Sequence, residues 1–107
     1  MAGDAEQLSI VVERDGDRMM VRLHGEVDIA TTPMLADRLN QMNGDDIVVD
    51  LAGLTFLDAS GLGALADAGK RAERRGNRLE IINADSLTQR MFELTALDYL
   101  LAGSDAI

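Results

Sequence analysis

The amino-acid sequence predicts an α/β fold, with a single domain built on a mixed, mostly parallel β-sheet of four to five strands packed with about four helices. Three observations lead to this prediction. The chain has 107 residues, which is enough for one hydrophobic core but not for two. It opens with two alternating apolar segments, which indicate an antiparallel hairpin. Strand and helix patterns then follow one another in turn, and this order requires crossover connections and therefore parallel strands.

The hairpin and the first helix come at the start of the chain. Apolar and polar residues alternate over 8–12 and again over 19–23, with the turn sequence Asp15-Gly16-Asp17 between them. Thr31-Thr32-Pro33 predicts the start of a helix, because a hydroxyl residue can cap it and proline suits its first turn. Asn43-Gly44 predicts its end.

The residues ahead of the hairpin, 1–7, show no periodicity. We therefore expect a flexible N-terminus followed by one domain over 8–107.

The middle of the chain predicts a buried strand, a short hydrophobic connection and a second helix. The apolar run that starts at Ile47 is typical of a strand covered on both faces. Residues 54–57 form the connection, and from Leu62 the apolar spacing becomes helical. The helix therefore begins near Ser60, with either Asp58 or Ser60 as its N-cap.

The last third predicts one more strand and one more helix. Gly76 ends the second helix, and a strand begins at Leu79. Asp85 then caps a helix that carries Leu87, Met91 and Leu94. The apolar segment 97–101 adds a final strand or helical turn.

Composition excludes several classes of function. The formal net charge of -9 disfavours direct binding to nucleic acid or to an anionic membrane, since both depend on neutralising phosphates. The absence of cysteine excludes disulfides and thiolate metal sites. No apolar run is long enough to insert into a membrane or to act as a secretory signal, so we expect a cytoplasmic protein. A protein partner is favoured.

Nucleophilic catalysis is poorly supported. A serine nucleophile needs a neighbouring base, and the only histidine, His24, lies in an alternating strand segment. Asp28 and Asp58 form a candidate carboxylate pair, but loop and helix-cap roles explain them equally well. We therefore expect no catalytic residue, no metal site and no cofactor, and we do not expect an enzyme.

A glycine pattern leaves one alternative open. Gly61 to Ala66 matches the G-x-G-x-x-A pattern of dinucleotide-binding folds, with Glu80 near the offset of the ribose-binding acid. The connection at 54–57 and the position of Glu80 inside a strand favour another interpretation, in which Gly61 and Gly63 permit a tight helix start and close packing on the sheet. A small nucleotide-binding module remains the alternative.

Ser60 lies where a regulatory phosphate would be tolerated. The free N–H groups and the positive dipole end of a helix favour an added anion. Ala64 and Ala68, which we expect on the outer side of this helix, are small enough to let a partner approach closely. The two interpretations of Ser60 are a phosphorylation site and a plain helix cap.

Three segments resemble the STAS family, the domain shared by sulfate transporters and anti-sigma factor antagonists. They are Gly25-Glu26-Val27-Asp28, the stretch from Asp50 to Leu65 centred on Asp58-Ala59-Ser60-Gly61-Leu62-Gly63, and Arg90-Met91-Phe92-Glu93-Leu94. The resemblance runs from about Leu8 to Leu101 and is nearest to the free-standing bacterial anti-sigma factor antagonists. Many members have a second hydroxyl residue where this chain has Ala59.

The resemblance implies a phosphorylation site at Ser60 and a set of residues that contact the partner. That set is Asp28, Asp58, Ala59, Ser60, Gly61, Leu62, Gly63 and Ala64. The unphosphorylated form is then expected to bind an anti-sigma factor that is also a serine kinase and to release the sigma factor, while phosphorylation blocks binding and a serine phosphatase resets the switch.

The resemblance also leaves room for other assemblies. One alternative is a STAS subunit of another bacterial signalling or lipid-transport assembly, and another is a constitutive scaffold in which Ser60 only caps a helix. We expect a monomer or a weak dimer.

Overall fold

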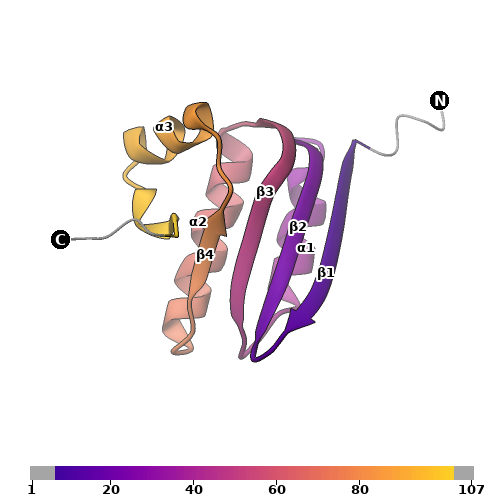
Figure 1. Cartoon of the computed structure of the whole chain (residues 1–107), viewed down its shortest axis with the longest axis vertical. Coiled ribbons are helices and arrows are strands. Elements are labelled where there is room, and N and C mark those ends of the chain that lie inside the picture. The colour runs from indigo at the N-terminus through magenta and orange to yellow at the C-terminus, as the bar shows by residue number, and fades with distance from the viewer. Residues whose placement is uncertain (1–6, 103–107) are drawn as a thin grey trace.

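The structure is a computed structural model that describes residues 7–102. Four strands form one sheet in the order β1-β2-β3-β4. The strands are β1 (Leu8–Asp15), β2 (Arg18–Val27), β3 (Asp46–Leu57) and β4 (Leu79–Ile82). The pair β1 and β2 is antiparallel, and the pairs β2–β3 and β3–β4 are parallel (Figure 1). The predicted mixed sheet with an opening hairpin is confirmed.

The helices lie in two places. In Figure 1, α1 (Thr32–Asn40) and α2 (Ala59–Arg74) lie behind the sheet and cover one of its faces, while α3 (Ser86–Leu94) and the 3₁₀ turn η2 (Asp98–Leu100) lie beyond β4. The described residues thus hold three α-helices and one 3₁₀ turn, where the sequence predicted about four helices. After η2, Leu101 makes a single parallel bridge to Ile81.

The predicted flexible N-terminus falls mostly on residues 1–6, which lie outside the described residues. Gln7 is described, and its backbone carbonyl accepts a hydrogen bond of 2.8 Å from the N–H of Glu26.

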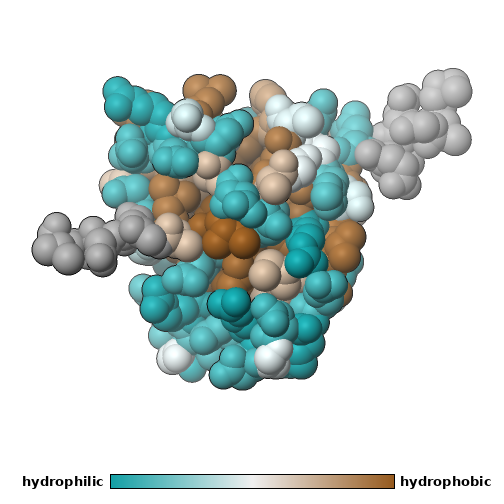
Figure 2. Space-filling model, viewed as in Figure 1, coloured by the Kyte–Doolittle hydropathy of each residue, from teal (hydrophilic) through white to brown (hydrophobic). Residues whose placement is uncertain are grey.

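The main core lies between the sheet and the two helices behind it. Its largest fully buried side chains come from all of these layers and from α3: Phe92, Leu23, Leu35, Leu65, Ile81, Val21, Val27 and Val49. The other face of the sheet is the one seen in Figure 2, where apolar surface in the middle is surrounded by hydrophilic groups. Met20 and Val48, which are partners in the β2–β3 register, are buried outside the main core.

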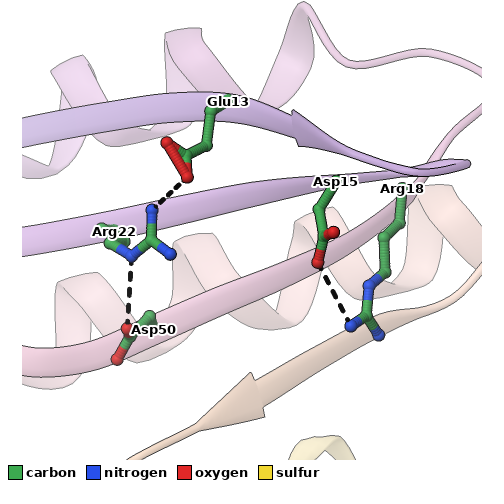
Figure 3. A network of polar contacts seen from close by, with 5 residues as sticks. All are labelled: Glu13, Asp15, Arg18, Arg22 and Asp50. Carbon is green, nitrogen blue, oxygen red and sulfur yellow. Dashed lines mark hydrogen bonds and ion pairs between the residues drawn. The ribbon is translucent and has the colours of Figure 1, made fainter.

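A row of polar side chains joins the strands on this second face. Arg22 on β2 pairs with Glu13 on β1 at 2.6 Å and with Asp50 on β3 at 3.7 Å (Figure 3). Asn83, which follows β4, donates a 2.9 Å hydrogen bond to Asp50. Burial alone would raise the pKa of Asp50, but the hydrogen bonds from Asn83 and the Ala52 N–H and the charge of Arg22 lower it below its ordinary value. The row therefore favours one register across the sheet.

Two element boundaries differ from the sequence prediction. β3 continues through the segment that we expected to be a hydrophobic connection, because Leu54, Phe56 and Leu57 go on pairing with β2. The first helix ends at Asn40, ahead of the predicted stop, and Gly44 adopts a left-handed φ of +88° in the loop that follows.

Only one of the three apolar residues that we named on the last helix contacts the core. Met91 packs against it, whereas Leu87 and Leu94 are 74% and 72% exposed. α3 lies beside β4 (Figure 1), and the residue that it buries fully is Phe92. Helical spacing alone cannot show which of two apolar sides is buried.

The two glycines of the predicted helix start have different roles. A Cβ atom on Gly61 would lie 2.5 Å from Leu57 Cδ1 and 2.6 Å from Val27 Cγ1, so the helix packs here directly on the ends of β2 and β3. A Cβ atom on Gly63 would meet nothing within 4 Å, and Gly63 is exposed. Close packing on the sheet therefore explains Gly61 but not Gly63.

This difference gives a matched pair of variants. Gly61→Ala should lower the free energy of unfolding by about 1–3 kcal/mol, because overpacking forces Val27 and Leu57 to move. Gly63→Ala should leave the free energy of unfolding unchanged or raise it by up to about 1 kcal/mol, because alanine favours a helix more than glycine does. Chemical denaturation of the two variants measures both values, and equal losses would contradict the packing that we describe.

Candidate functional site

The candidate site lies where β2 and β3 end side by side. Val27 and Leu57 are register partners at the carboxyl ends of these two parallel strands. The chain then enters α1 after β2 and α2 after β3, so both helices begin at the same edge of the sheet. Thr32, the first residue of α1, and Ser60, the second residue of α2, approach each other there, with 3.0 Å between their hydroxyl oxygens.

Asp58 caps α2. Its backbone is extended, and its Oδ1 atom accepts hydrogen bonds from the N–H groups of Ser60 at 3.0 Å and Gly61 at 3.3 Å. These N–H groups have no partner inside the helix, so the carboxylate satisfies them. The structure thus decides between the two predicted N-caps, and the cap is Asp58.

The same carboxylate oxygen holds the hydroxyl group of Ser60. Ser60 Oγ donates a hydrogen bond of 2.5 Å to Asp58 Oδ1. This bond lowers the pKa of Asp58 most strongly; burial raises it, and the N–H groups of Gly61 and Ser60 lower it further, so the net pKa lies below the ordinary value. Asp58 is therefore ionised at neutral pH, next to the positive end of the α2 dipole.

The hydroxyl of Ser60 has a fixed orientation. Ser60 is half-buried, its proton points to Asp58, and the rest of its oxygen faces Thr32 and the surface. A nucleophilic oxygen with a carboxylate at hydrogen-bond distance can receive a phosphoryl group.

Asp28 holds the loop between β2 and α1, which is one of the roles that the sequence allowed for it; its contact with a partner stays a prediction. Its Oδ1 atom accepts hydrogen bonds from the N–H groups of Ala30 at 2.9 Å and Thr31 at 3.0 Å. The Asp28 carboxylate thus makes its hydrogen bonds within its own loop. None of the described hydrogen bonds links it to Ser60. Asp28 shapes the loop that leads into α1 and so places Thr32.

The structure brings together only part of the predicted partner-contact set. Asp58 and Ser60 are joined by hydrogen bonds, and Ala59 and Gly63 are exposed beside them. Ala64 is half-buried. Gly61 and Leu62 are buried against the sheet and core and so offer no side chain to a partner. Ala68, which we expected on the outer side of the helix, is 3% exposed and belongs to the core.

Sequence reasoning missed three residues at this edge of the sheet. Thr32 contacts Ser60, although its position after a second threonine indicated only a helix start. Ile29 is 80% exposed in the loop after β2, and Phe56 is 50% exposed at the end of β3. Contiguous exposed apolar surface is typical of a site that binds another protein, so these two side chains are candidates for a partner contact. The signal in the sequence was an isoleucine within a loop rich in polar residues.

Two absences hold for the described part of the chain. No group of three or more histidine, cysteine, aspartate or glutamate side chains in residues 7–102 is arranged to hold a metal ion. No helix within the same residues has the length and apolar character needed to cross a membrane.

Comparison with protein families and relatives agrees with the predicted resemblance. A family model described as "Mlab, STAS domain" matches residues 10–102. The anti-sigma-B factor antagonist of Staphylococcus aureus (strain NCTC 8325 / PS 47) is 32% identical over 84 residues, which cover 76% of this chain and 78% of that protein. The anti-sigma-B factor antagonist of Bacillus subtilis (strain 168) is 25% identical over 92 residues and 84% of each chain.

Solved structures show the same fold. An anti-sigma factor antagonist from Mycobacterium paratuberculosis superposes with a TM-score of 0.79 at 24% identity, over 89% of this chain and 83% of that chain. The anti-sigma factor antagonist SpoIIAA in its unphosphorylated form superposes with a TM-score of 0.75 at 19% identity, over 87% and 85%. Its phosphorylated form gives a TM-score of 0.72. The predicted fold class is confirmed.

The hydrogen bond between Ser60 and Asp58 predicts a pH effect. In Ser60→Ala the pKa of Asp58 should rise toward the ordinary aspartate value, because the donor that lowers it most is gone. A carboxyl whose pKa is lowered by folding adds stability above its unfolded pKa, and this stability is lost as the pH falls through the folded pKa. Ser60→Ala should therefore lose less stability on acidification than the wild type. Titration of the carboxyl carbons by NMR measures the pKa values.

Asp85 provides the control for this titration. It caps α3, and the N–H and side chain of Thr88 hold its pKa below the ordinary value. Its pKa should be the same in the wild type and in Ser60→Ala. An unchanged pKa of Asp58 in the variant would contradict the site geometry.

Proposed function

We propose that this chain, which belongs to the STAS domain family, is an anti-sigma factor antagonist whose binding to its partner is controlled by phosphorylation of Ser60. Its relatives named anti-sigma-B factor antagonists, of which the Staphylococcus aureus protein is 32% identical, support the role. The observation that carries the choice of residue is the Ser60 hydroxyl, held by Asp58 and Thr32 at the start of α2.

The partner that we propose is an anti-sigma factor that also acts as a serine kinase. In the transfer, Ser60 Oγ forms a bond to the γ-phosphorus of a nucleoside triphosphate, and the bond between that phosphorus and the nucleoside diphosphate breaks. The hydroxyl proton leaves along the hydrogen bond toward Asp58 and passes on to solvent. A serine phosphatase restores the hydroxyl by hydrolysis of the phosphate ester. The chain itself supplies the acceptor and catalyses no reaction in this scheme.

Phosphorylation changes the surface at one point and leaves the scaffold in place. It removes the proton that Ser60 donates to Asp58 and puts nearly two negative charges beside that carboxylate. The exposed apolar side chains at this edge, Ile29 and Phe56, suit a docked partner in the unmodified state. A phosphate inside such a contact disrupts it by repulsion and by the cost of removing its water. The same proposal puts the protein in the cytoplasm, with the sigma factor.

Two other roles make different predictions. The family model also carries the name Mlab, so a STAS subunit of another bacterial assembly is the second candidate; it predicts a partner that is not an anti-sigma factor. The nucleotide-binding alternative predicts saturable binding of a nucleotide, although close packing against Leu57 and Val27 already accounts for Gly61 without one.

The acceptor can be tested directly. Incubation with the anti-sigma kinases of the source organism and ATP should add one phosphate, and Ser60→Ala should abolish the addition because, within residues 7–102, Asp58 holds only the Ser60 hydroxyl. Mass spectrometry maps the modified residue. Thr55→Val is the matched control, since the Thr55 hydroxyl donates to the Gly25 carbonyl and lies outside the site. A phosphate on Thr31, Thr55 or Ser86 would refute the assignment of Ser60.

The switch itself is tested by competition. Added to a reconstituted complex of anti-sigma factor and sigma factor, the unmodified protein should release sigma, and protein that carries phosphoserine at position 60 should not. Ser60→Asp should bind the anti-sigma factor more weakly while its free energy of unfolding stays within about 1 kcal/mol of the wild type. Equal release by both forms would refute the switch, and release by neither would favour the second candidate.

A further inference from the structure

Thr32 is a second hydroxyl group at the phosphorylation site. It is the first residue of α1, it is half-buried, and its Oγ1 lies 3.0 Å from Ser60 Oγ. The cap position of α1 is Thr31, whose hydroxyl donates to the Glu26 carbonyl and so serves the loop. Helix capping therefore does not account for Thr32.

The direction of the hydrogen bonds follows from the number of protons. Ser60 has one hydroxyl proton, and it points to Asp58 Oδ1, because an ionised carboxylate can only accept. Ser60 has no proton left for Thr32, so Thr32 is the donor and Ser60 Oγ is the acceptor in the 3.0 Å contact. The three groups form a chain in which the Thr32 hydroxyl donates to Ser60 and the Ser60 hydroxyl donates to Asp58.

We propose that Thr32 is a positioning residue for the modification of Ser60: its hydroxyl fixes the orientation of Ser60 Oγ before transfer and donates a hydrogen bond to the phosphoryl group after it. This inference rests on the proposed function, because it concerns the same acceptor. With one lone pair of Ser60 Oγ facing Thr32 and the proton facing Asp58, the remaining lone pair has a defined direction for attack on phosphorus.

The Thr32 hydroxyl matters more to the phosphorylated form than to the unmodified form. Once Ser60 is phosphorylated, its oxygen no longer has the proton that it donated to Asp58. The phosphate then lies beside that negative carboxylate at the start of α2. The N–H groups of Ser60 and Gly61 at the start of α2 already donate to the Asp58 side chain, so they are not free to bind the phosphate. The Thr32 hydroxyl turns freely about its C–O bond, so it can follow the oxygen atoms that replace the proton.

Thr32 is not itself the acceptor. Its oxygen has no carboxylate among the described contacts to take up its proton, whereas Ser60 has Asp58 at 2.5 Å. The Ser60 hydroxyl is therefore the group that reacts, and the Thr32 hydroxyl is the group that orients it.

The deciding experiment uses no kinase. Phosphoserine is inserted at position 60 during translation, and its second pKa is measured by phosphorus NMR in the wild type, Thr32→Val and Thr32→Ser. A donated hydrogen bond stabilises the phosphate dianion and lowers this pKa. Thr32→Val, which has nearly the same shape but no hydroxyl, should raise it, and Thr32→Ser should restore the wild-type value. Thr55→Val is the control and should leave it unchanged.

A kinase assay tests the first half of the proposal. Thr32→Val should lower kcat/KM for phosphorylation of Ser60 roughly tenfold through a misplaced nucleophile, and Thr32→Ser should recover most of the rate. The melting temperature of each variant shows that the fold is kept.

The outcomes separate this proposal from the function on which it rests. An equal phosphoserine pKa in the wild type and Thr32→Val, or a phosphate found on Thr32, would overturn the role of Thr32. Failure of every kinase to modify wild-type Ser60 would refute the proposed function, while the phosphorus titration would still decide whether Thr32 binds the phosphate.

Discussion

One oxygen atom organises this site. Asp58 Oδ1 accepts hydrogen bonds from the N–H groups of Ser60 and Gly61 and from the Ser60 hydroxyl. The same atom therefore caps α2 and orients the Ser60 hydroxyl, so a change in one affects the other. The position of this atom is fixed in turn by the sheet, because the N–H of Asp58 donates to the Val27 carbonyl and the side chains of Val27 and Leu57 close on Gly61. A rigid base of this kind lets a small chemical change at Ser60 act on the surface alone.

Much of the fold was predictable because its signals are local. Period-two alternation marks the hairpin, an apolar run marks β3, and Asp85 marks the start of α3, and each depends on neighbouring residues only. The end of β3 was not predictable in this way. Leu54 to Leu57 lack a clean period, and they are strand because β2 continues to offer hydrogen bonds beside them. The pairing partner, and not the segment itself, sets that boundary.

The site was predictable at its centre and not at its edges. Asp58 and Ser60 are two residues apart in the chain, so a cap pattern finds both. Thr32 and Ser60 are far apart in sequence and meet because β2 and β3 are parallel neighbours whose helices both begin at one edge. The burial of Leu62 and Ala68 likewise depends on how α2 is rotated against the sheet. Such facts belong to tertiary structure, and no spacing rule contains them.

If Ser60 is phosphorylated, as we propose, the location of the charges makes the phosphate affect binding more than folding. Half of the ten basic residues lie at 70–78, toward the far end of α2. Lys70, the first of them, comes ten residues after Ser60, which is about 15 Å along the helix and beyond the screening length of about 8 Å at physiological ionic strength. These cations therefore cannot neutralise the phosphate, and its near neighbour is the negative Asp58. In the free domain, water keeps the phosphate solvated at this half-exposed position. In the proposed complex a docked partner removes that water, so the phosphate destabilises the complex and not the free domain.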